Sequence, residues 1–483
     1  MKRLNWRTIM HIMGLLLVIN GLGMLLCLPW SLYFHDEQHT NILLSAGITL
    51  LAGGIIWSST LRHEKTIGKR EGFLVVTLGW LFLTLSGTLP YLLSASIPHF
   101  ADAFFETVSG YTTTGASILT DIEVVPKSIL FWRSYTQWVG GMGIIVLTIA
   151  ILPILGIGGM QLFMAESPGP TADKLHPRIK ETAKRLWAVY VLLTGLEVGA
   201  LMLCDMDLFE SVCHSLATLA TGGFGTRNAS IAAYGPEVQY VITFFMFLAG
   251  VNFTLNYYLI KGKFRLAWRN EEFRKYLIVI GILTVITTSI VFGVTTDGGE
   301  KSFRESLFMV VSVITTTGFV TADYTAWTPF LTTLFFVLLF VGASSGSTSG
   351  GIKLIRFTVV IKNGLLELKR ILHPRALFPV RINGAAMPEN ITFNILGFFL
   401  LYITIFVFGS IVMTTLGLDL ETAIGATATS LGNVGPGIGK VGPAYNFAWM
   451  NDPSKYFLSL LMLIGRLEIF TVLVLFTRAF WQD

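Results

Sequence analysis

The chain has 483 residues, of which 53% are hydrophobic and 13% are charged, and its mean hydropathy is +0.67. Soluble globular domains carry about 25% charged residues, so this composition excludes a soluble protein and indicates a chain that crosses a membrane many times. The net charge of +5 would fit a nucleic-acid partner, but the basic residues lie in short loops between apolar runs. That distribution indicates membrane topology and argues against nucleic acid as a partner.

About ten apolar runs are long enough to cross a bilayer, which takes roughly 20 helical residues. The first run lacks a small-residue cleavage site, so we expect a retained span and no cleaved signal peptide. An even number of spans places both termini on one side, where most of the 34 lysines and arginines also lie. The positive-inside rule therefore predicts cytoplasmic termini. The expected spans lie near residues 9–33, 40–60, 73–96, 128–155, 186–205, 236–260, 275–294, 328–350, 393–416 and 455–480.

Between the later spans, a shorter element with a helical pattern occurs four times. The four copies are ADAFFETVSGYTTTGAS, LFESVCHSLATLATGGFG, FRESLFMVVSVITTTGF and LETAIGATATSLGNVGPG. Each has about a dozen helical residues, which cover about 18 Å or roughly half a bilayer. Each then breaks at a glycine, namely Gly115, Gly223, Gly318 and Gly435.

This internal repeat predicts the domain organisation. We expect an all-α polytopic membrane protein in which residues 1–66 form an N-terminal transmembrane hairpin. Four parallel, pseudo-symmetric units of span, half-length helix, break and span would follow around a central pore. Their expected bounds are 67–170, 171–268, 269–372 and 373–483.

Irregular backbone at membrane depth is tolerated only where protein or a water-filled path surrounds it, so the four breaks should converge on one axis. Half-length helices would direct their partly negative C-terminal ends inward, and the Thr and Gly residues beyond them can present backbone carbonyls. A ring of carbonyls suits a dehydrated monovalent cation. The alternative is that the Thr/Gly clusters are ordinary loops or helix-packing motifs, but four copies in one context favour a filter.

The TTTG, TGG, TTTG and NVGPG breaks, in this order, resemble the Trk/Ktr/HKT superfamily of potassium transporters, and within it the bacterial TrkH subunits, over essentially the whole chain. The resemblance implies that each repeat supplies one filter strand, with K⁺ held by carbonyls at and just before the glycine. The fourth strand departs most from the others, with Asn433 in place of a threonine and Pro436 following. The implied filter residues are Thr113, Thr114, Gly115, Thr221, Gly222, Gly223, Thr316, Thr317, Gly318, Asn433, Val434 and Gly435.

The second span of the third unit is interrupted by VGASSGSTSGGIK, Val341–Lys353. Each glycine there costs a helix up to about 1 kcal/mol relative to alanine, which favours an unwound loop. The resembling family has an intramembrane gating loop at this place, while the alternative is a GxxxG packing face. The expected gate residues in this loop are Gly342, Ser345, Gly346, Ser347, Gly350 and Gly351.

Arg466 lies in the last span, where an arginine costs about 2.5–3.5 kcal/mol on insertion scales and usually faces a cavity with a partner. The resemblance implies that Arg466 is an electrostatic latch on the gating loop; the alternative is a snorkelling arginine. Its partner is not identified by the sequence, since Glu468 does not share its face. Acids near the outer mouth could raise the local cation concentration, although solvated surface charge is the favoured interpretation for any one of them. These acids are Asp102, Glu106, Asp121, Glu123, Glu305, Asp323 and Glu421.

The three cysteines are scattered and the eight histidines form no pair at metal-ligand spacing. We therefore expect no disulfide framework, no transition-metal site and no enzyme activity, with K⁺ at the filter residues as the only metal. The resemblance implies a homodimer in a bacterial inner membrane and a separate TrkA-type regulatory ring. That ring would bind NAD, ATP or ADP, and this chain would bind no cofactor.

The basic inner segments 170–185, 261–275 and 353–381 would suit such a ring, and anionic lipid equally well. Two competing functions remain. A secondary transporter of an organic solute would show inverted repeats with one or two breaks. A membrane-embedded enzyme would need acids or histidines that cluster at one leaflet, and none do.

Overall fold

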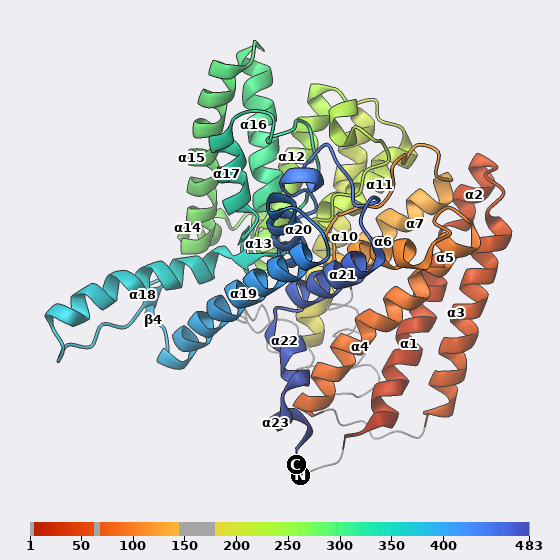
Figure 1. Cartoon of the computed structure of the whole chain (residues 1–483), viewed down its shortest axis with the longest axis horizontal. Helices are drawn as coiled ribbons and strands as arrows, with labels where there is room; N and C mark the ends of the chain where they lie inside the picture. Colours follow the sequence, from red (N-terminus) through yellow and green to blue (C-terminus); the bar gives the residue numbers. More distant parts are fainter. Residues whose placement is uncertain (1–3, 62–67, 144–178, 297, 483) are drawn as a thin grey trace.

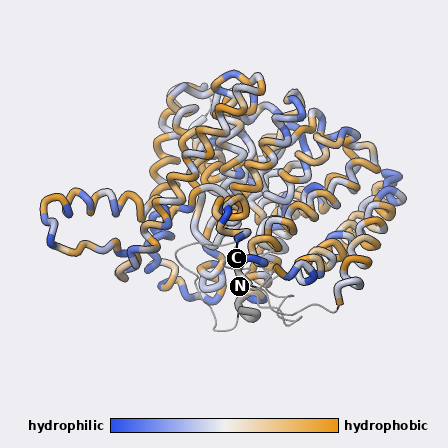
Figure 2. The backbone as a smooth tube through the Cα atoms, turned by 60° about the horizontal axis from the view of Figure 1, so that its bottom comes forward, coloured by the Kyte–Doolittle hydropathy of each residue, from blue (hydrophilic) through white to orange (hydrophobic). Residues whose placement is uncertain are grey.

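The computed structural model describes residues 4–61, 68–143, 179–296 and 298–482. The described residues are mainly helical, and their only strands are two short pairs. Strands β1 (Val341–Gly342) and β2 (Ile352–Lys353) pair in parallel, whereas β3 (Arg381–Ile382) and β4 (Ala385–Ala386) form an antiparallel hairpin. Six helical spans in these residues are long and apolar enough to cross a bilayer, and two bent helix pairs also qualify. Figure 2 shows apolar residues along most of the helices. The helical membrane fold expected from the sequence is confirmed.

The N-terminal hairpin consists of α1 (Trp6–Leu25), α2 (Leu28–Phe34) and α3 (His39–Ser59). Its long helices approach closely because they meet at glycines: a Cβ on Gly14 would lie 2.6 Å from the backbone nitrogen of Trp57. Asp36, in the turn between α2 and α3, joins the hairpin to the next unit. Its carboxylate accepts hydrogen bonds from the Ser128 backbone and hydroxyl at 2.9 and 2.7 Å.

Four units follow in the expected order of span, half-length helix, break and second span. Unit 1 contains α4 (Lys69–Gly87), α5 (Leu89–Leu93), α6 (Phe100–Tyr111), α7 (Lys127–Trp138) and the π-helix η1 (Val139–Gly143). Unit 2 contains α10 (Ile179–Leu203), α11 (Leu208–Leu219), η2 (Ser230–Ala233), α12 (Pro236–Gly250), α13 (Phe253–Ile260) and α14 (Phe264–Arg269). Unit 3 contains α15 (Glu271–Val294), α16 (Gly299–Ile314), α17 (Pro329–Leu338), β1, β2 and α18 (Leu354–Leu372). Unit 4 contains β3, β4, α19 (Glu389–Thr415), α20 (Leu420–Gly432), η3 (Gly439–Val441), α21 (Asp452–Arg466), α22 (Phe470–Leu473), η4 (Val474–Phe476) and α23 (Arg478–Trp481).

The unit boundaries that the sequence predicts remain a prediction. Those at 66/67 and 170/171 lie outside the described residues. The boundary at 268/269 lies inside α14, before its last residue, and that at 372/373 coincides with the end of α18. The half-length helices α6, α11, α16 and α20 have 12, 12, 16 and 13 residues, close to the dozen expected.

The second spans are not the continuous helices that the sequence predicted near residues 236–260 and 455–480. Helices α12 and α13 meet at an angle of 115°, and α21 meets the segment that begins with α22 at 109°. Asn252 restarts the helix after the first bend, since its side chain accepts a hydrogen bond from the Thr254 backbone. Glu468 and Ile469 make the second bend with positive φ angles of 57° and 60°. The prediction of unbroken helices was therefore wrong in both places.

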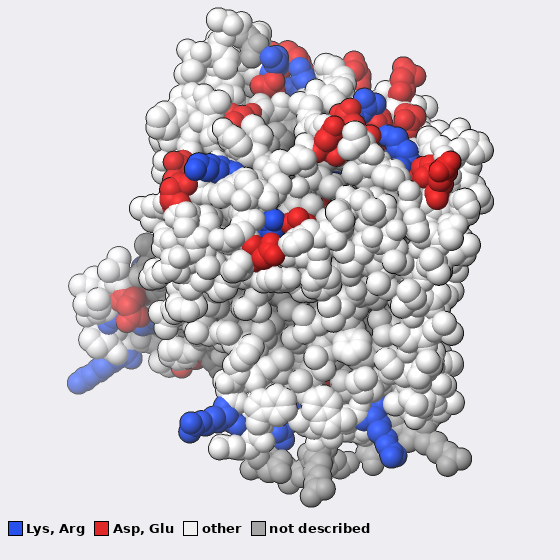
Figure 3. Space-filling view, turned by 45° about the vertical axis from the view of Figure 1, so that its right-hand side comes forward, with Lys and Arg blue, Asp and Glu red and all other residues white. Residues whose placement is uncertain are grey.

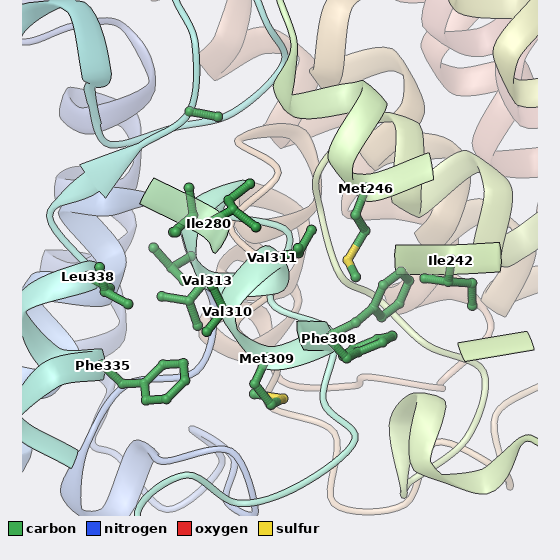
Figure 4. Close-up of a cluster of buried hydrophobic side chains, with 14 of the residues drawn as sticks. Ile242, Met246, Ile280, Phe308, Met309, Val310, Val311, Val313, Phe335 and Leu338 are labelled. Atoms are coloured by element: carbon green, nitrogen blue, oxygen red, sulfur yellow. The ribbon is translucent and has the colours of Figure 1, made fainter. Parts of the chain in front are cut away.

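The half-length helices form the buried centre of the molecule. Figure 4 shows this for α16, whose residues Phe308–Val311 and Val313 pack against Ile242 and Met246 of α12, Ile280 of α15, and Phe335 and Leu338 of α17. At one end of the molecule, Asn5 bonds Glu71 and Arg70 bonds the Phe480 carbonyl, so that the starts of α1 and α4 meet α23 (Figure 1).

Candidate functional site

The four half-length helices end in the same backbone motif. At the end of α6, the Thr113 N–H donates to the Gly110 carbonyl and the Thr114 N–H donates to the Ser109 carbonyl, at 3.0 and 2.9 Å. This pair of bonds is a Schellman motif, in which the residue after the helix is left-handed and is usually glycine. The same bonds recur in the other units, where the left-handed residues are Thr221, Thr316 and Asn433.

Threonine is an unfavourable residue at this position. The φ angles of Thr113, Thr221 and Thr316 are 53°, 54° and 55°, a region that β-branched residues rarely adopt. Such strain persists only when the surrounding structure enforces it, and it concentrates at functional sites. Asn433 has a φ of 53°, so the fourth break has the backbone of the other three although its sequence departs most. Asparagine tolerates this conformation better than threonine does.

The four breaks close into a ring. A Cβ on Gly115 would lie 2.3 Å from the carbonyl oxygen of Gly222, the middle residue of the next break. The same relation joins unit 2 to unit 3, unit 3 to unit 4 and unit 4 back to unit 1, with distances of 2.0, 2.1 and 2.8 Å to the oxygens of Thr317, Val434 and Thr114. Each glycine also has a positive φ, between 76° and 102°. The structure thus brings all twelve predicted filter residues together in cyclic order.

A second ring of hydrogen bonds, which we call the outer collar, lies two residues beyond the glycines. There the carbonyl of each break accepts a hydrogen bond from the preceding unit. The donors and acceptors are Phe447 N to Ser117 O (2.9 Å), Arg133 Nη1 to Gly225 O (2.9 Å), Ile231 N to Val320 O (3.1 Å) and Tyr324 Oη to Gly437 O (2.6 Å). The collar holds each break to its neighbour.

Each half-length helix also contacts the segment that leaves its own break, three residues after the glycine. Glu106 of α6 accepts from the Ile118 N–H at 2.9 Å, and His214 of α11 bonds the Thr226 hydroxyl at 3.2 Å. In unit 3 the Met309 sulfur accepts from the Thr321 N–H at 3.5 Å. In unit 4 the helix presents a glycine, whose missing Cβ would lie 2.5 Å from the Ile438 carbonyl oxygen. One architectural contact is therefore made by four different residue types.

Glu106 is not the solvated surface charge that the sequence suggested. Its side chain is fully buried and forms an ion pair of 2.6 Å with Arg133, which is 2% exposed. The Arg133 guanidinium also lies 3.5 Å from the centroid of the Phe224 ring. Gln137, one turn along the same face of α7, donates to the Gly222 carbonyl at 2.6 Å and accepts from the Phe224 N–H. Helix α7 thus holds the second break with two side chains that the sequence did not single out.

The interrupted span of unit 3 is a loop in contact with the ring. Between Val341 and Lys353 the chain is not helical, which excludes a helical GxxxG face. The Gly350 N–H donates to the Thr316 hydroxyl at 2.6 Å, and a Cβ on Gly350 would lie 2.5 Å from the Gly432 carbonyl oxygen. The loop thereby meets two breaks at once.

Several predicted gate residues have defined roles in holding the loop. Gly346 and Gly351 have φ angles of 75° and 62°, and a Cβ on Gly342 would lie 2.2 Å from the Gly350 carbonyl oxygen. The Ser347 hydroxyl donates to the Ser344 carbonyl at 2.6 Å. The backbone of Ser345 is held from both sides, because its N–H donates to Glu272 at 2.8 Å and its carbonyl accepts from Asn252 at 2.6 Å.

Arg466 binds this loop directly. Its guanidinium donates to the Thr348 carbonyl at 2.8 Å and to the carbonyls of Gly140 and Gly141 in η1, both at 2.7 Å. These contacts place its head group among backbone carbonyls of units 1 and 3, so the snorkelling alternative does not describe it. Glu468 has a different partner, since it pairs with Arg356 of α18.

Within the described residues, His, Cys, Asp and Glu side chains form no group of three that could hold a metal ion. The acids that the sequence analysis assigned to the outer mouth are mostly engaged with neighbours: Asp102 pairs with Lys455 at 2.5 Å, and Asp121 accepts from the Asn228 amide at 2.9 Å. The chemistry that the ring offers is therefore that of backbone carbonyls.

Comparisons with known proteins place this geometry in context. A family model described as "TrkH: Cation transport protein" matches residues 38–483. The chain is 41% identical to the Trk system potassium uptake protein TrkH of Salmonella typhimurium and 40% identical to that of Escherichia coli, covering 99% of this chain and all of each relative. Among solved structures, it matches the crystal structure of the potassium transporter TrkH from Vibrio parahaemolyticus with a TM-score of 0.89 and 36% identity, over 99% of this chain and all of that one.

Proposed function

The chain belongs to the TrkH family of cation transport proteins, and on this premise we propose that it takes up potassium through a gated filter of backbone carbonyls. It is a multi-pass membrane transporter of the Trk potassium uptake type, and it is not an enzyme. We further propose which residues form the filter and the gate, on which side of the membrane the termini lie, and which partners the chain binds.

The observation that carries the filter assignment is the cyclic contact between each glycine and the middle carbonyl of the next break. We assign K⁺ binding to the carbonyls of Thr113–Gly115, Thr221–Gly223, Thr316–Gly318 and Asn433–Gly435. Left-handed residues at the first and third positions of each break support this assignment, because they reorient successive peptide units so that neighbouring carbonyls can share a side. Carbonyls arranged in this way can replace the water that a monovalent cation loses.

We assign the gate to the loop Val341–Lys353 and to Arg466. The loop contacts the ring through Gly350, and Arg466 fastens it through the Thr348 carbonyl. Hydrogen bonds from a charged donor are worth about 1.5–3 kcal/mol each, enough to hold a loop in one of two positions. We propose that opening requires Arg466 to leave these carbonyls.

The proposed surroundings are a bacterial inner membrane with both termini in the cytoplasm. Charge supports this orientation: in Figure 3 most acidic side chains of the face shown lie toward one end, where lysines and arginines are interspersed with them, whereas lysines and arginines predominate at the other end. A regulatory ring of the TrkA type, carrying NAD, ATP or ADP, would dock on the basic end. For the four repeats we keep the bounds that the sequence predicts, namely 67–170, 171–268, 269–372 and 373–483.

We also propose a homodimer. Helix α18 projects from the body of the molecule (Figure 1) and leaves an apolar stripe uncovered. Apolar residues at helical spacing form this stripe, each at least 60% exposed: Ile361, Leu365, Leu368 and Leu372. A second copy of the chain would cover such a stripe.

Uptake of ⁸⁶Rb⁺ into liposomes that hold the purified chain tests the proposal. We expect ⁸⁶Rb⁺ influx that external K⁺ inhibits by competition, with or without a regulatory subunit. The absence of any flux under both conditions would reject cation permeation. Transport of an organic solute would then be the alternative, although four equivalent breaks in one ring favour it less than one or two broken helices would.

A further inference from the structure

Glu197 is a buried acid that the filter and the gate do not use. It lies in α10, and it is the only charged residue between Arg185 and Asp205. The side chain is 0% exposed, and neither carboxyl oxygen has a hydrogen-bond partner. An ionised carboxylate without a partner is very costly in an apolar environment, and an ionisable residue inside a span is by default a functional site.

The immediate surroundings of Glu197 suit a neutral acid. Leu193 and Leu201, one turn to either side on the same face of α10, are buried. The Thr218 hydroxyl of α11 faces the carboxyl, but it donates its own proton to the His214 carbonyl at 2.8 Å. While the hydroxyl makes that bond, it can act toward Glu197 only as an acceptor, and an acceptor suits a protonated acid and not a carboxylate.

No described cation balances a charge at this position. Helix α10 packs against α11, α12, α13 and η1, and η1 carries no titratable residue. The titratable groups of α11 have other partners: His214 bonds Tyr234, Glu210 pairs with Arg227, and Cys213 is buried beside Ser134. In α12, Tyr240 bonds Glu300 and Glu237 is in the first turn. The titratable groups of α13 are Tyr257, whose ring lies against Lys261, and Tyr258.

The carboxyl is linked to the ring by a short path. Thr218 lies in the last turn of α11, and its carbonyl accepts the hydrogen bond from the Thr221 N–H at 2.9 Å that ends the helix. Thr221 is the left-handed first residue of the second break. A change of charge beside Thr218 therefore acts on the motif that sets the conformation of this break.

We propose that Glu197 is an intramembrane proton-binding site whose carboxylic acid holds a proton in the conformation described and whose deprotonation loosens the second filter strand. Release breaks the carboxyl O–H bond, and the proton passes to water that enters where α10 and α11 separate. The carboxylate that remains is stable only while that water solvates it. Because the water enters only when α11 moves, proton release and movement of α11 are coupled. The effect on flux depends on the proposed function, whereas proton binding at Glu197 does not.

Infrared spectroscopy and transport test this proposal on the full chain in liposomes. In the wild type we expect the carbonyl-stretch band of a protonated carboxylic acid at neutral pH, together with ⁸⁶Rb⁺ influx that changes between mildly acidic and mildly alkaline pH. Glu197→Gln should lose that band and the pH dependence. Glu197→Leu, which fills the apolar site without a proton, should lose both as well. Glu237→Gln, at an exposed acid of α12, is the matched control and should keep both.

Three results would overturn the proposal: a neutral-pH spectrum of the wild type without such a band, a band that survives in Glu197→Gln, or an unchanged pH dependence in that variant. If neither substitution gives folded protein, the wild-type spectrum recorded while the pH is raised decides, because the band must disappear as the proton leaves. If the wild type carries no Rb⁺ at all, the proposed function fails, and the spectrum still decides the proton site.

Discussion

The guanidinium of Arg133 in unit 1 donates a hydrogen bond to the carbonyl oxygen of Gly225 in unit 2, at 2.9 Å. This is the one contact of the outer collar in which the donor is charged; the other donors are backbone N–H groups and a tyrosine hydroxyl. Arg133 can donate this bond from a buried position because the buried carboxylate of Glu106 balances its charge. The ion pair therefore anchors two breaks, since Glu106 also accepts from the Ile118 N–H.

Removing one member of this pair should cost more than removing both. Arg133→Met leaves Glu106 as an uncompensated buried charge, for which we expect a loss of about 3–5 kcal/mol in the free energy of unfolding. The double variant Arg133→Met with Glu106→Gln leaves no charge at this position and should lose less than Arg133→Met alone, and so less than the sum of the single variants. Unfolding in detergent micelles, analysed as a double-mutant cycle, measures the difference. Arg478→Met at an exposed site is the control, and strictly additive effects would contradict the assignment.

The filter glycines should tolerate no side chain. A Cβ on Gly318 would lie 2.1 Å from the Val434 carbonyl oxygen, and one on Gly115 lies nearly as close to its neighbour. We expect Gly318→Ala and Gly115→Ser to abolish the preference for K⁺ over Na⁺ or the flux itself, measured as ⁸⁶Rb⁺ influx in competition with each ion. Gly281→Ala is the control, because nothing lies within 4 Å of its added Cβ. Unchanged selectivity in the filter variants would mean that the glycines do not line the ion path.

The ring could be anticipated because its determinants are local. A run such as Thr112–Gly115 disfavours a helix, and the recurrence of such a run after each half-length helix indicates a common purpose. The fourth break is the least regular in sequence, yet Asn433 adopts the same left-handed conformation, because that conformation accommodates asparagine. The different residues of the fourth break therefore keep the left-handed conformation at its first and third positions.

The contacts that hold the ring could not be predicted in the same way. Glu106 resembles a surface acid in the middle of a short helix, and its partner Arg133 is 27 residues away with no motif that links them. Two of the four collar donors are backbone groups, which any sequence supplies. The bend after α12 depends on how Asn252 meets the loop of unit 3, and hydropathy alone reports only a long apolar run.

Arg466 should hold the gate closed through charge and through the number of its donors. Arg466→Gln loses the charge and cannot reach three carbonyls in two units, so the closed loop should lose at least one bond worth about 1.5–3 kcal/mol. Because 1.4 kcal/mol corresponds to a tenfold change, ⁸⁶Rb⁺ influx without a regulatory subunit should rise about tenfold or more. Arg466→Lys keeps the charge as a single ammonium group and should give an intermediate flux. A decrease in flux in Arg466→Gln would rule out a latch, and so would a flux equal to that of the exposed-site control Arg478→Gln.

The hydroxyl of Thr316 should couple the gate to the filter. It accepts the Gly350 N–H at 2.6 Å, so a filter residue of the third break binds the loop directly. Thr316→Val keeps the shape of the side chain but leaves a buried N–H without an acceptor, which costs about 1–3 kcal/mol and should favour the open loop. Thr316→Ser retains the acceptor and serves as the matched control. We expect higher ⁸⁶Rb⁺ influx in Thr316→Val than in Thr316→Ser, with the preference for K⁺ over Na⁺ maintained in both. Equal flux in the two variants would show that this hydrogen bond plays no part in closing the path. A loss of selectivity in Thr316→Val alone would mean that the hydroxyl shapes the filter itself.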